Sequence, residues 1–132
     1  MVKSGGLKFK VIEKGQPGVA GGGEKKFYAQ IVNGGEATVD ELVRDIEKFS
    51  ALSEADIRGV IVALENVIQE KLAQSRIVRL EKIGSLYPSI SSQGELDPKK
   101  VSSDSIRKVS VNYRPGIRIL KALEEAGFSK QQ

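Results

Sequence analysis

The sequence predicts an α+β protein in which a helical hairpin is followed by paired strands and a short final helix, with an additional strand hairpin at the N-terminus. The helices are predicted by two stretches that begin with capping residues and carry apolar residues every three or four positions. The strands are predicted by segments in which apolar and polar residues alternate. With 132 residues, 39% of them hydrophobic, the chain is long and apolar enough for a folded domain and is not disordered throughout.

The N-terminal region, residues 1–36, is predicted to be a β-hairpin extension. Residues 7–12 alternate apolar and basic side chains, and residues 25–32 resume a strand pattern after a glycine-rich loop over residues 15–23. That loop lacks the spacing of a phosphate-binding loop before a helix, so a solvated connector is the favoured interpretation. The hairpin lysines could contact phosphate, but a structural role against the sheet is favoured.

Two capped helices are predicted next. Thr38-Val39-Asp40-Glu41 has the form of a capping box, and the helix that follows carries Leu42, Ile46 and Phe49 on one face. Ser53-Glu54-Ala55-Asp56 caps a longer helix that runs to about Gln74. Its apolar stripe consists of Ile57, Val60, Ile61, Leu64, Ile68 and Leu72. Two capped helices joined by a short turn make a helical hairpin.

The C-terminal part is predicted to contain three strand segments. Residues 76–81 alternate, Gly84 interrupts the pattern, and residues 85–90 resume it. Pro88 predicts an edge strand or a bulge, because proline cannot donate to a strand ladder. Residues 106–113 form the last predicted strand.

A final helix is expected over residues 117–126, after the turn Arg114-Pro115-Gly116 and before Gly127. Asp97 followed by Pro98 predicts a short capped turn between the last two strands. Residues 129–132 are expected to be a polar tail, which leaves 37–128 as the principal domain.

Charge and composition narrow the function. The chain has no cysteine and no histidine, which excludes disulfides and removes the commonest metal ligand and general base, so we expect neither an enzyme nor a metal or other cofactor. Residues 31–75 are acidic, whereas residues 1–30 hold 6 basic and 2 acidic side chains and residues 76–132 hold 11 and 6. Clustered positive charge favours a polyanion partner.

Two motifs carry a resemblance to a known family. Arg79-Leu80-Glu81-Lys82-Ile83-Gly84-Ser85-Leu86 resembles the segment V-x-L-x-G-F-G-T-F of bacterial HU and integration host factor proteins, and Asn112-Tyr113-Arg114-Pro115-Gly116 resembles their A-F-K-P-G-K segment. The motifs follow a helical hairpin at similar spacing, and the resemblance covers about residues 37–126. With its N-terminal extension, the chain is similar to the divergent HU-like (HU-HIG) branch.

The resemblance implies an intertwined homodimer, with a helical base and a β-saddle whose two arms enter the DNA minor groove. It implies a cytoplasmic, nucleoid-associated bacterial protein that binds double-stranded DNA, with no membrane and no small-molecule substrate as partner. The N-terminus likewise does not look like a secretory signal. The residues expected in the dimer core are Leu42, Ile46, Phe49, Ile57, Ile61, Leu64, Ile68 and Leu86.

The expected DNA-binding residues come from two sources. By position in the family motifs, the backbone amides of Gly84 and Ser85 approach phosphate and Arg114 supplies charge. Lys82 and Arg118 could restore charge where this sequence lacks family residues, since Lys82 replaces a glycine and Ile117 replaces a lysine. The remaining expected contacts are Arg79 and a basic cluster on the expected arm, namely Lys99, Lys100, Arg107 and Lys108. Because neighbours on a strand face opposite ways, at most one of Arg107 and Lys108 is expected to face a given groove.

The expected arm tip departs from the family pattern. Pro98 is preceded by Asp97 and Glu95, and carboxylates are repelled by a phosphate-lined groove. Two functions therefore remain open. The first is non-sequence-specific architectural DNA binding with modest bending, and the alternative is a structural or protein-interaction dimer that has lost most of its DNA affinity.

Overall fold

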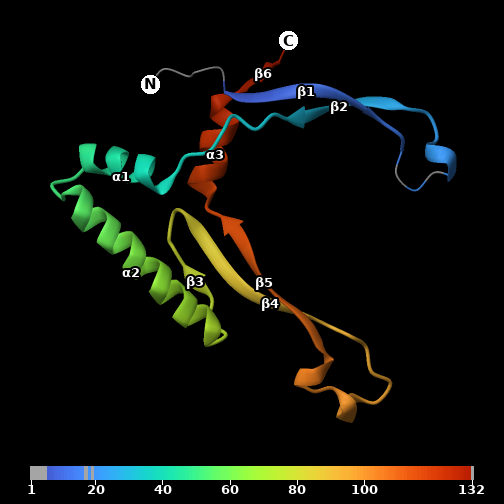
Figure 1. Ribbon diagram of the computed structural model, residues 1–132. Helices are drawn as coiled ribbons and strands as arrows, with labels where there is room; N and C mark the ends of the chain where they lie inside the picture. The colour runs from blue at the N-terminus through green and yellow to red at the C-terminus, as the bar shows by residue number, and fades with distance from the viewer. Residues whose placement is uncertain (1–5, 17, 19, 132) are drawn as a thin grey trace. The chain divides into compact units, whose positions relative to one another are not determined.

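The computed structural model describes residues 6–16, 18 and 20–131 (Figure 1). The chain forms two compact units. The terminal unit combines Met1–Glu36 with Leu120–Gln132, and the central unit is Ala37–Ile119. Each contains its own three-stranded sheet.

The terminal unit contains the predicted N-terminal hairpin. Strands β1 (Leu7–Lys14) and β2 (Lys26–Ile31) pair antiparallel, so both predicted strands are confirmed. Between them lies the glycine-rich loop, which includes a 3₁₀ turn at Ala20–Gly22. Two residues of that predicted loop, Pro17 and Val19, lie outside the described residues.

The predicted polar tail is wrong. Strand β6 (Phe128–Lys130) pairs in parallel with β1, which makes β1 the central strand of the order β2-β1-β6. Gly127, with φ at 74°, redirects the chain after the last helix, and its carbonyl accepts a 2.9 Å hydrogen bond from Leu7 N–H. A strand of three residues is too short to show the two-residue period in the sequence.

The helical hairpin of the central unit is confirmed. Helix α1 (Val39–Lys48) begins after Thr38, whose hydroxyl accepts from Glu41 N–H at 3.3 Å. Helix α2 (Glu54–Ala73) begins with a complete capping box between Ser53 and Asp56. Among the described residues the capping box predicted at Thr38 is only half formed, because no return bond from the Glu41 carboxylate accompanies the threonine bond.

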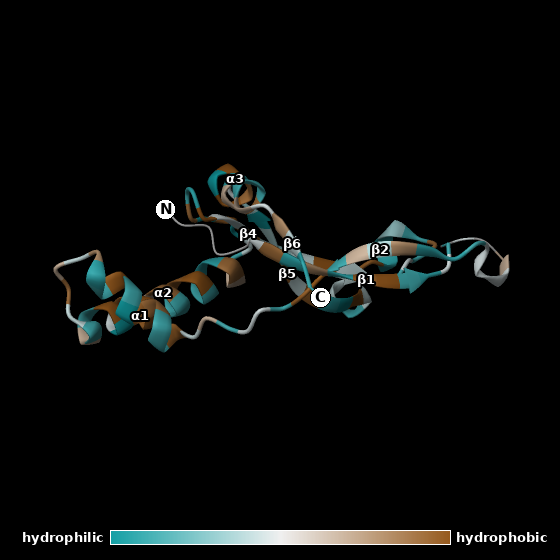
Figure 2. Ribbon diagram, turned by 90° about the horizontal axis from the view of Figure 1, so that it is seen from above, coloured by the Kyte–Doolittle hydropathy of each residue, from teal (hydrophilic) through white to brown (hydrophobic). Residues whose placement is uncertain are grey.

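Contact between the two helices buries few side chains. Val43 on α1 is 0% exposed and Ile57 on α2 is 4% exposed. The predicted apolar face of α1 is open in the single chain, where Phe49, the C-cap residue of the helix, is 89% exposed. Val43 was not recognised in the sequence, because the stripe Leu42, Ile46, Phe49 matches the helical period on the adjacent face. In Figure 2, hydrophobic and hydrophilic residues follow one another along both α1 and α2.

The central sheet has the antiparallel order β3-β4-β5, formed by β3 (Val78–Arg79), β4 (Gly84–Ser92) and β5 (Ile106–Pro115). The strand predicted over residues 76–81 is reduced to two residues, because Leu80–Gly84 forms a turn in which Glu81 adopts a φ of 52°. Pro88 pairs only with β5, since β3 reaches no further along β4 than Leu86. The edge position predicted by that proline is therefore confirmed.

Beyond the sheet, β4 and β5 are joined by the tip loop, defined here as Gln93–Ser105. The predicted cap is present, since the Asp97 carboxylate accepts from Lys99 N–H at 3.0 Å and begins the 3₁₀ turn Pro98–Lys100. A second 3₁₀ turn, Ser103–Ser105, leads into β5. Helix α3 (Ile117–Ala126) has the predicted bounds.

The β3–β4 turn is fixed against the junction of β5 and α3. The carbonyl of Ile83 accepts two hydrogen bonds, from the Tyr113 hydroxyl at 2.6 Å and from Gly116 N–H at 3.1 Å. Gly84 follows with a φ of 132°, and a Cβ atom there would lie 2.2 Å from the Arg114 carbonyl oxygen. Only glycine fits this position without displacing β5.

We predict that Gly84→Ala lowers the free energy of unfolding by about 2–3 kcal/mol, because the methyl group combines an unfavourable φ with a backbone clash. Gly94→Ala is the matched control, since no atom lies within 4 Å of the added carbon. Denaturant unfolding measures both variants. Equal midpoints for the two would show that the close packing at Gly84 is not needed.

Candidate nucleic-acid interface

The central sheet has one continuous polar face. Residues directly opposite one another in an antiparallel pair project to the same side, and that side changes with every residue. Ser85 is opposite both Arg79 and Arg114, Tyr87 is opposite Asn112, and the alternation continues to Ser91 and its partner Lys108. The polar face consists of Arg79, Ser85, Tyr87, Ser89, Ser91, Lys108, Ser110, Asn112 and Arg114. It carries three cations and no carboxylate.

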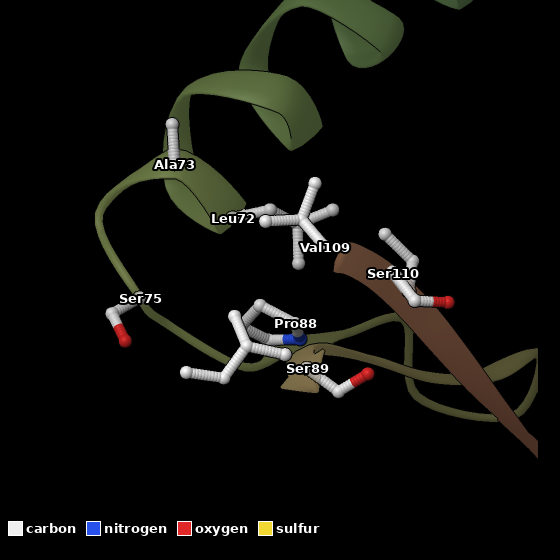
Figure 3. Close-up of a pocket in the computed structure, with 9 residues that line it drawn as sticks. Leu72, Ala73, Ser75, Pro88, Ser89, Val109 and Ser110 are labelled. Carbon is white, nitrogen blue, oxygen red and sulfur yellow. The ribbon is translucent and has the colours of Figure 1, made fainter. Parts of the chain in front are cut away.

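The opposite face of the sheet is apolar. Its residues are Val78, Leu86, Pro88, Ile90, Val109, Val111 and Tyr113. Helix α2 contacts β3 and β4, and a pocket of about 500 Å³ lies between the end of α2 and the sheet. Leu72 of α2 and Val109 of β5 both line this pocket (Figure 3). Because α2 packs on the apolar side, the polar face is the side left for an external ligand.

At one end of the polar face, neighbouring side chains orient two arginines. Arg79 donates to the Ser85 hydroxyl at 3.4 Å, and the Arg114 guanidinium lies 5.0 Å from the centre of the Tyr87 ring. Stacking of this kind restricts a guanidinium while leaving its N–H groups available. Both arginines are exposed. β3 and β5 are separated by β4 alone, so the two backbones lie roughly 10 Å apart.

Lys82 and Arg118 lie at the same end of the sheet, but not within its strands. Lys82 belongs to the β3–β4 turn. Its carbonyl oxygen lies against Gly116, so closely that a Cβ atom added to Gly116 would be 2.1 Å from that oxygen. Arg118 is the second residue of α3, which begins directly after Gly116. Both side chains are exposed, so they extend the positive charge beyond the arginine pair.

One expected contact has a different role. The Gly84 N–H, expected to approach phosphate, donates to the Glu81 carbonyl at 3.2 Å and closes the β3–β4 turn. The small size of Gly84 instead allows β5 to approach. Ser85 lies on the polar face, where its hydroxyl accepts from Arg79.

The basic cluster predicted for the arm is divided. Lys108 lies on the polar face, whereas Lys99 and Lys100 lie in the 3₁₀ turn of the tip loop. Arg107 is the extra residue of a bulge, because Lys108 pairs with Ser91 and Ile106 pairs with Ser92. The expectation that Arg107 and Lys108 face opposite sides assumed an uninterrupted strand, and a bulge interrupts that alternation.

The tip loop uses its polar side chains locally. Asp97 caps the 3₁₀ turn, and the Glu95 carboxylate accepts from the Gln93 amide at 2.8 Å. Pro98 is the first residue of that turn. Leu96, between the two acidic residues, is fully exposed. Leu96 was missed in the sequence, since a lone apolar residue in a polar loop has no periodic signal.

The polar face also contains residues that the sequence analysis missed: Tyr87, Ser89, Ser91, Ser110 and Asn112. The register that places them beside the arginines could have been found by aligning the two alternating strands across the tip loop.

Among the described residues, no group of three or more carboxylates is arranged to hold a metal ion. Within the same residues, no helix is long and apolar enough to cross a membrane.

A helical hairpin, an amphipathic three-stranded sheet and a short final helix define an α+β protein of the HU-like type. The chain belongs to the HU-HIG family, described as an HU domain fused to a winged helix-turn-helix, Ig or glycine-rich motif, which it matches over residues 6–130. This confirms the resemblance found in the sequence. No match was found among curated proteins.

A solved structure from Bacteroides vulgatus ATCC 8482, described as a candidate bacterial DNA-binding protein, has a similar fold. The two share a TM-score of 0.67 at 12% identity, over 97% of this chain and 48% of that chain. This chain therefore spans about half the length of that relative.

We predict that Tyr113→Phe lowers the free energy of unfolding by about 1 kcal/mol, because it removes the hydroxyl that donates to the Ile83 carbonyl. Tyr87→Phe is the control, since the contact of Tyr87 with the Arg114 guanidinium is made by the ring, which phenylalanine keeps. Denaturant unfolding measures the difference. If the two variants had the same free energy of unfolding, the hydrogen bond from Tyr113 to Ile83 would not stabilise the β3–β4 turn.

Proposed function

We propose that this protein is an architectural homodimer that binds duplex DNA without sequence preference and acts in the bacterial nucleoid. The observation that carries the proposal is the polar face, which has three cations, no carboxylate and a row of short hydroxyl side chains on the side of the sheet away from α2. Membership in an HU-like DNA-binding family and the description of the Bacteroides vulgatus structure support it.

The chemistry of the polar face suits phosphate more than base edges. A guanidinium presents paired N–H donors that match two phosphate oxygens, and serine hydroxyls donate to phosphate at short range. Arg79 and Arg114 supply the charge at one end of the face and Lys108 supplies it at the other. Lys82 and Arg118 add cations beside the arginine pair, and Lys99 and Lys100 add them in the tip loop. Neutralised phosphates release counterions, which drives binding without reading sequence.

The tip loop favours a second candidate function, a dimer that binds another protein. Leu96 is fully exposed between Glu95 and Asp97, and an apolar side chain flanked by carboxylates suits a protein partner better than a phosphate-lined groove. For the DNA-binding proposal, the same loop implies shallow minor-groove contact and modest bending, because Pro98 begins a 3₁₀ turn in place of projecting from a hairpin.

Exposed apolar surface supports the homodimer. Val43 and Ile57 are the buried large hydrophobic residues among those described, although a chain of this size ordinarily buries most of its apolar side chains. Within the proposed dimer core, Ile57 is buried, Leu42, Ile46, Phe49 and Leu64 are exposed, and Ile61, Ile68 and Leu86 are half-buried. A second copy that covers α1, α2 and the apolar face of the sheet would complete this core.

We predict that light scattering gives twice the 14.3 kDa chain mass and that Leu64→Asp abolishes this dimer. Leu64 is 45% exposed in the single chain, and a carboxylate there would be buried without a partner in the dimer, at a cost of several kcal/mol. Gln69→Asp adds the same charge to the same helix and should leave the dimer intact. A wild-type monomer at micromolar concentration, or a stable dimer of the Leu64→Asp variant, would contradict the proposed interface.

For DNA, we predict that the logarithm of the binding constant falls against the logarithm of salt with a slope near −4 to −5, as expected for roughly four to six phosphates neutralised per dimer. Arg114→Gln should weaken binding equally for unrelated duplexes and make the slope shallower. Arg44→Gln, an exposed arginine on α1, should do neither. Gel shifts over a salt series with random duplexes measure these effects.

Two outcomes of those gel shifts would contradict DNA binding as proposed. Absence of binding at low salt would favour the protein-interaction dimer. A preference above about a hundredfold for one sequence would require base contacts that the polar face does not offer. Pro98→Ala should change affinity little, because that proline shapes a turn.

A further inference from the structure

We infer that the sheet of the terminal unit presents a second phosphate-binding surface and contacts duplex DNA through a face that carries four lysines. This inference rests on the proposed function. It extends DNA contact from the polar face of the central unit to the terminal unit. The surface is built by β1 and β2, with a contribution from β6.

The strand register sorts the lysines onto one side. Lys10 is opposite Gln30, Ile12 is opposite Tyr28, and Lys14 is opposite Lys26. Lys8 is paired with Ser129 of β6. The lysine face consists of Lys8, Lys10, Ile12, Lys14, Lys26, Tyr28, Gln30 and Ser129. A side-chain contact independently supports this assignment, since Lys14 Nζ lies 5.0 Å from the centre of the Tyr28 ring.

The other side of the same sheet is mainly apolar and holds the one carboxylate of the two paired strands, Glu13. Its residues are Leu7, Phe9, Val11, Glu13, Phe27, Ala29, Ile31, Phe128 and Lys130. The lysine face therefore has four cations and no anion. A merely solvated face usually intersperses both signs of charge, because like charges on one surface repel one another.

Protection of a sheet edge does not account for all of these lysines. Edge strands often carry lysine to prevent pairing with other chains, but Lys8 lies where β1 has a neighbour on each side: it pairs with Ser129 of β6, and its carbonyl accepts a 2.8 Å hydrogen bond from Val32 N–H. All four lysines are exposed, and none takes part in the ion pairs found among the described residues. Their charge is thus uncompensated within the described protein and available to an anion.

The geometry of the lysine face fits the backbone of duplex DNA. Eight residues of β1 span about 26 Å, and alternate residues are about 6.6 Å apart, so the lysines form a row of point charges. Lysine binds phosphate as a point charge and does not read sequence. A single-stranded partner would require open aromatic platforms, but Tyr28 is only half-exposed and is covered by Lys14. An anionic membrane would favour apolar residues among the lysines, whereas most apolar residues lie on the other side.

Two phosphate-binding surfaces on one chain have a thermodynamic consequence. Once one unit is bound, contact by the other is intramolecular and proceeds at a high effective concentration. Each lysine that neutralises a phosphate adds about 0.9 to the magnitude of the salt slope. Loss of two lysines from this face should therefore be measurable in both affinity and salt dependence.

The test compares the full-length wild type with K8Q/K10Q, using a fluorescent random duplex at several salt concentrations. We expect K8Q/K10Q to bind about tenfold more weakly at about 0.1 M salt, with a shallower salt slope than the wild type. A second variant, K14Q/K26Q, should give the same result from the opposite end of the face. The control K48Q/K121Q, which removes two exposed lysines from helices α1 and α3, should bind within twofold of the wild type.

The outcomes separate this inference from the proposal it extends. If both lysine-face variants bound with wild-type affinity and slope while Arg114→Gln was weakened, the lysine face would be excluded and the polar face would stand. If the wild type failed to bind duplex DNA at low salt, the proposed function would itself fail. If the variants lost only binding to phosphatidylserine vesicles, the face would be a membrane surface and the inference would be wrong. Circular dichroism matching the wild type confirms that each variant is folded.

Discussion

The two-residue alternation of side chains along a β-strand is the constraint on which the rest of this structure depends. In the central sheet it places Arg79, Ser85 and Arg114 on one side and the apolar residues on the other. In the terminal sheet it separates the β1 lysines from Leu7, Phe9 and Val11 in the same way. Each sheet therefore has one surface suited to a polyanion and one suited to apolar packing. A slip of one residue would exchange these surfaces, so register is essential to the proposed function.

Specific contacts keep the register of the central sheet. The Ile83 carbonyl accepts hydrogen bonds from the Tyr113 hydroxyl and from Gly116 N–H, which connects the β3–β4 turn to the end of β5. Gly84 allows the two strands to approach there, and a bulge between Ser91 and Ser92 changes the register at the other end. These backbone contacts fix the strands that carry the phosphate-binding face we propose, so the positions of its residues are set by packing within the sheet. In the homodimer that we propose, a second copy would cover the exposed apolar residues of α1 and α2.

Much of this fold is predictable from the sequence because its signals are local. Capping residues at Thr38 and Ser53 locate the helices, and the Asp97-Pro98 cap is visible in the same way. Features that depend on distant contacts were not predicted: the strand at Phe128–Lys130 exists only because β1 pairs with it. The bulge at Arg107 and the burial of Val43 likewise depend on partners that a periodic pattern does not reveal. For the candidate site, charged residues and family motifs identify the arginines, whereas the serines and Tyr87 beside them require the cross-strand register.

The most direct test of this account asks which side of the central sheet duplex DNA covers. The sequence contains no cysteine, so single cysteines can be introduced at adjacent positions on opposite faces, Ser89→Cys on the polar face and Ile90→Cys on the apolar face. The rate of thiol labelling is then measured with and without a random duplex. We predict that DNA slows labelling several-fold at position 89 and leaves the rate at position 90 unchanged. Equal protection at both positions, or protection at position 90 alone, would contradict it.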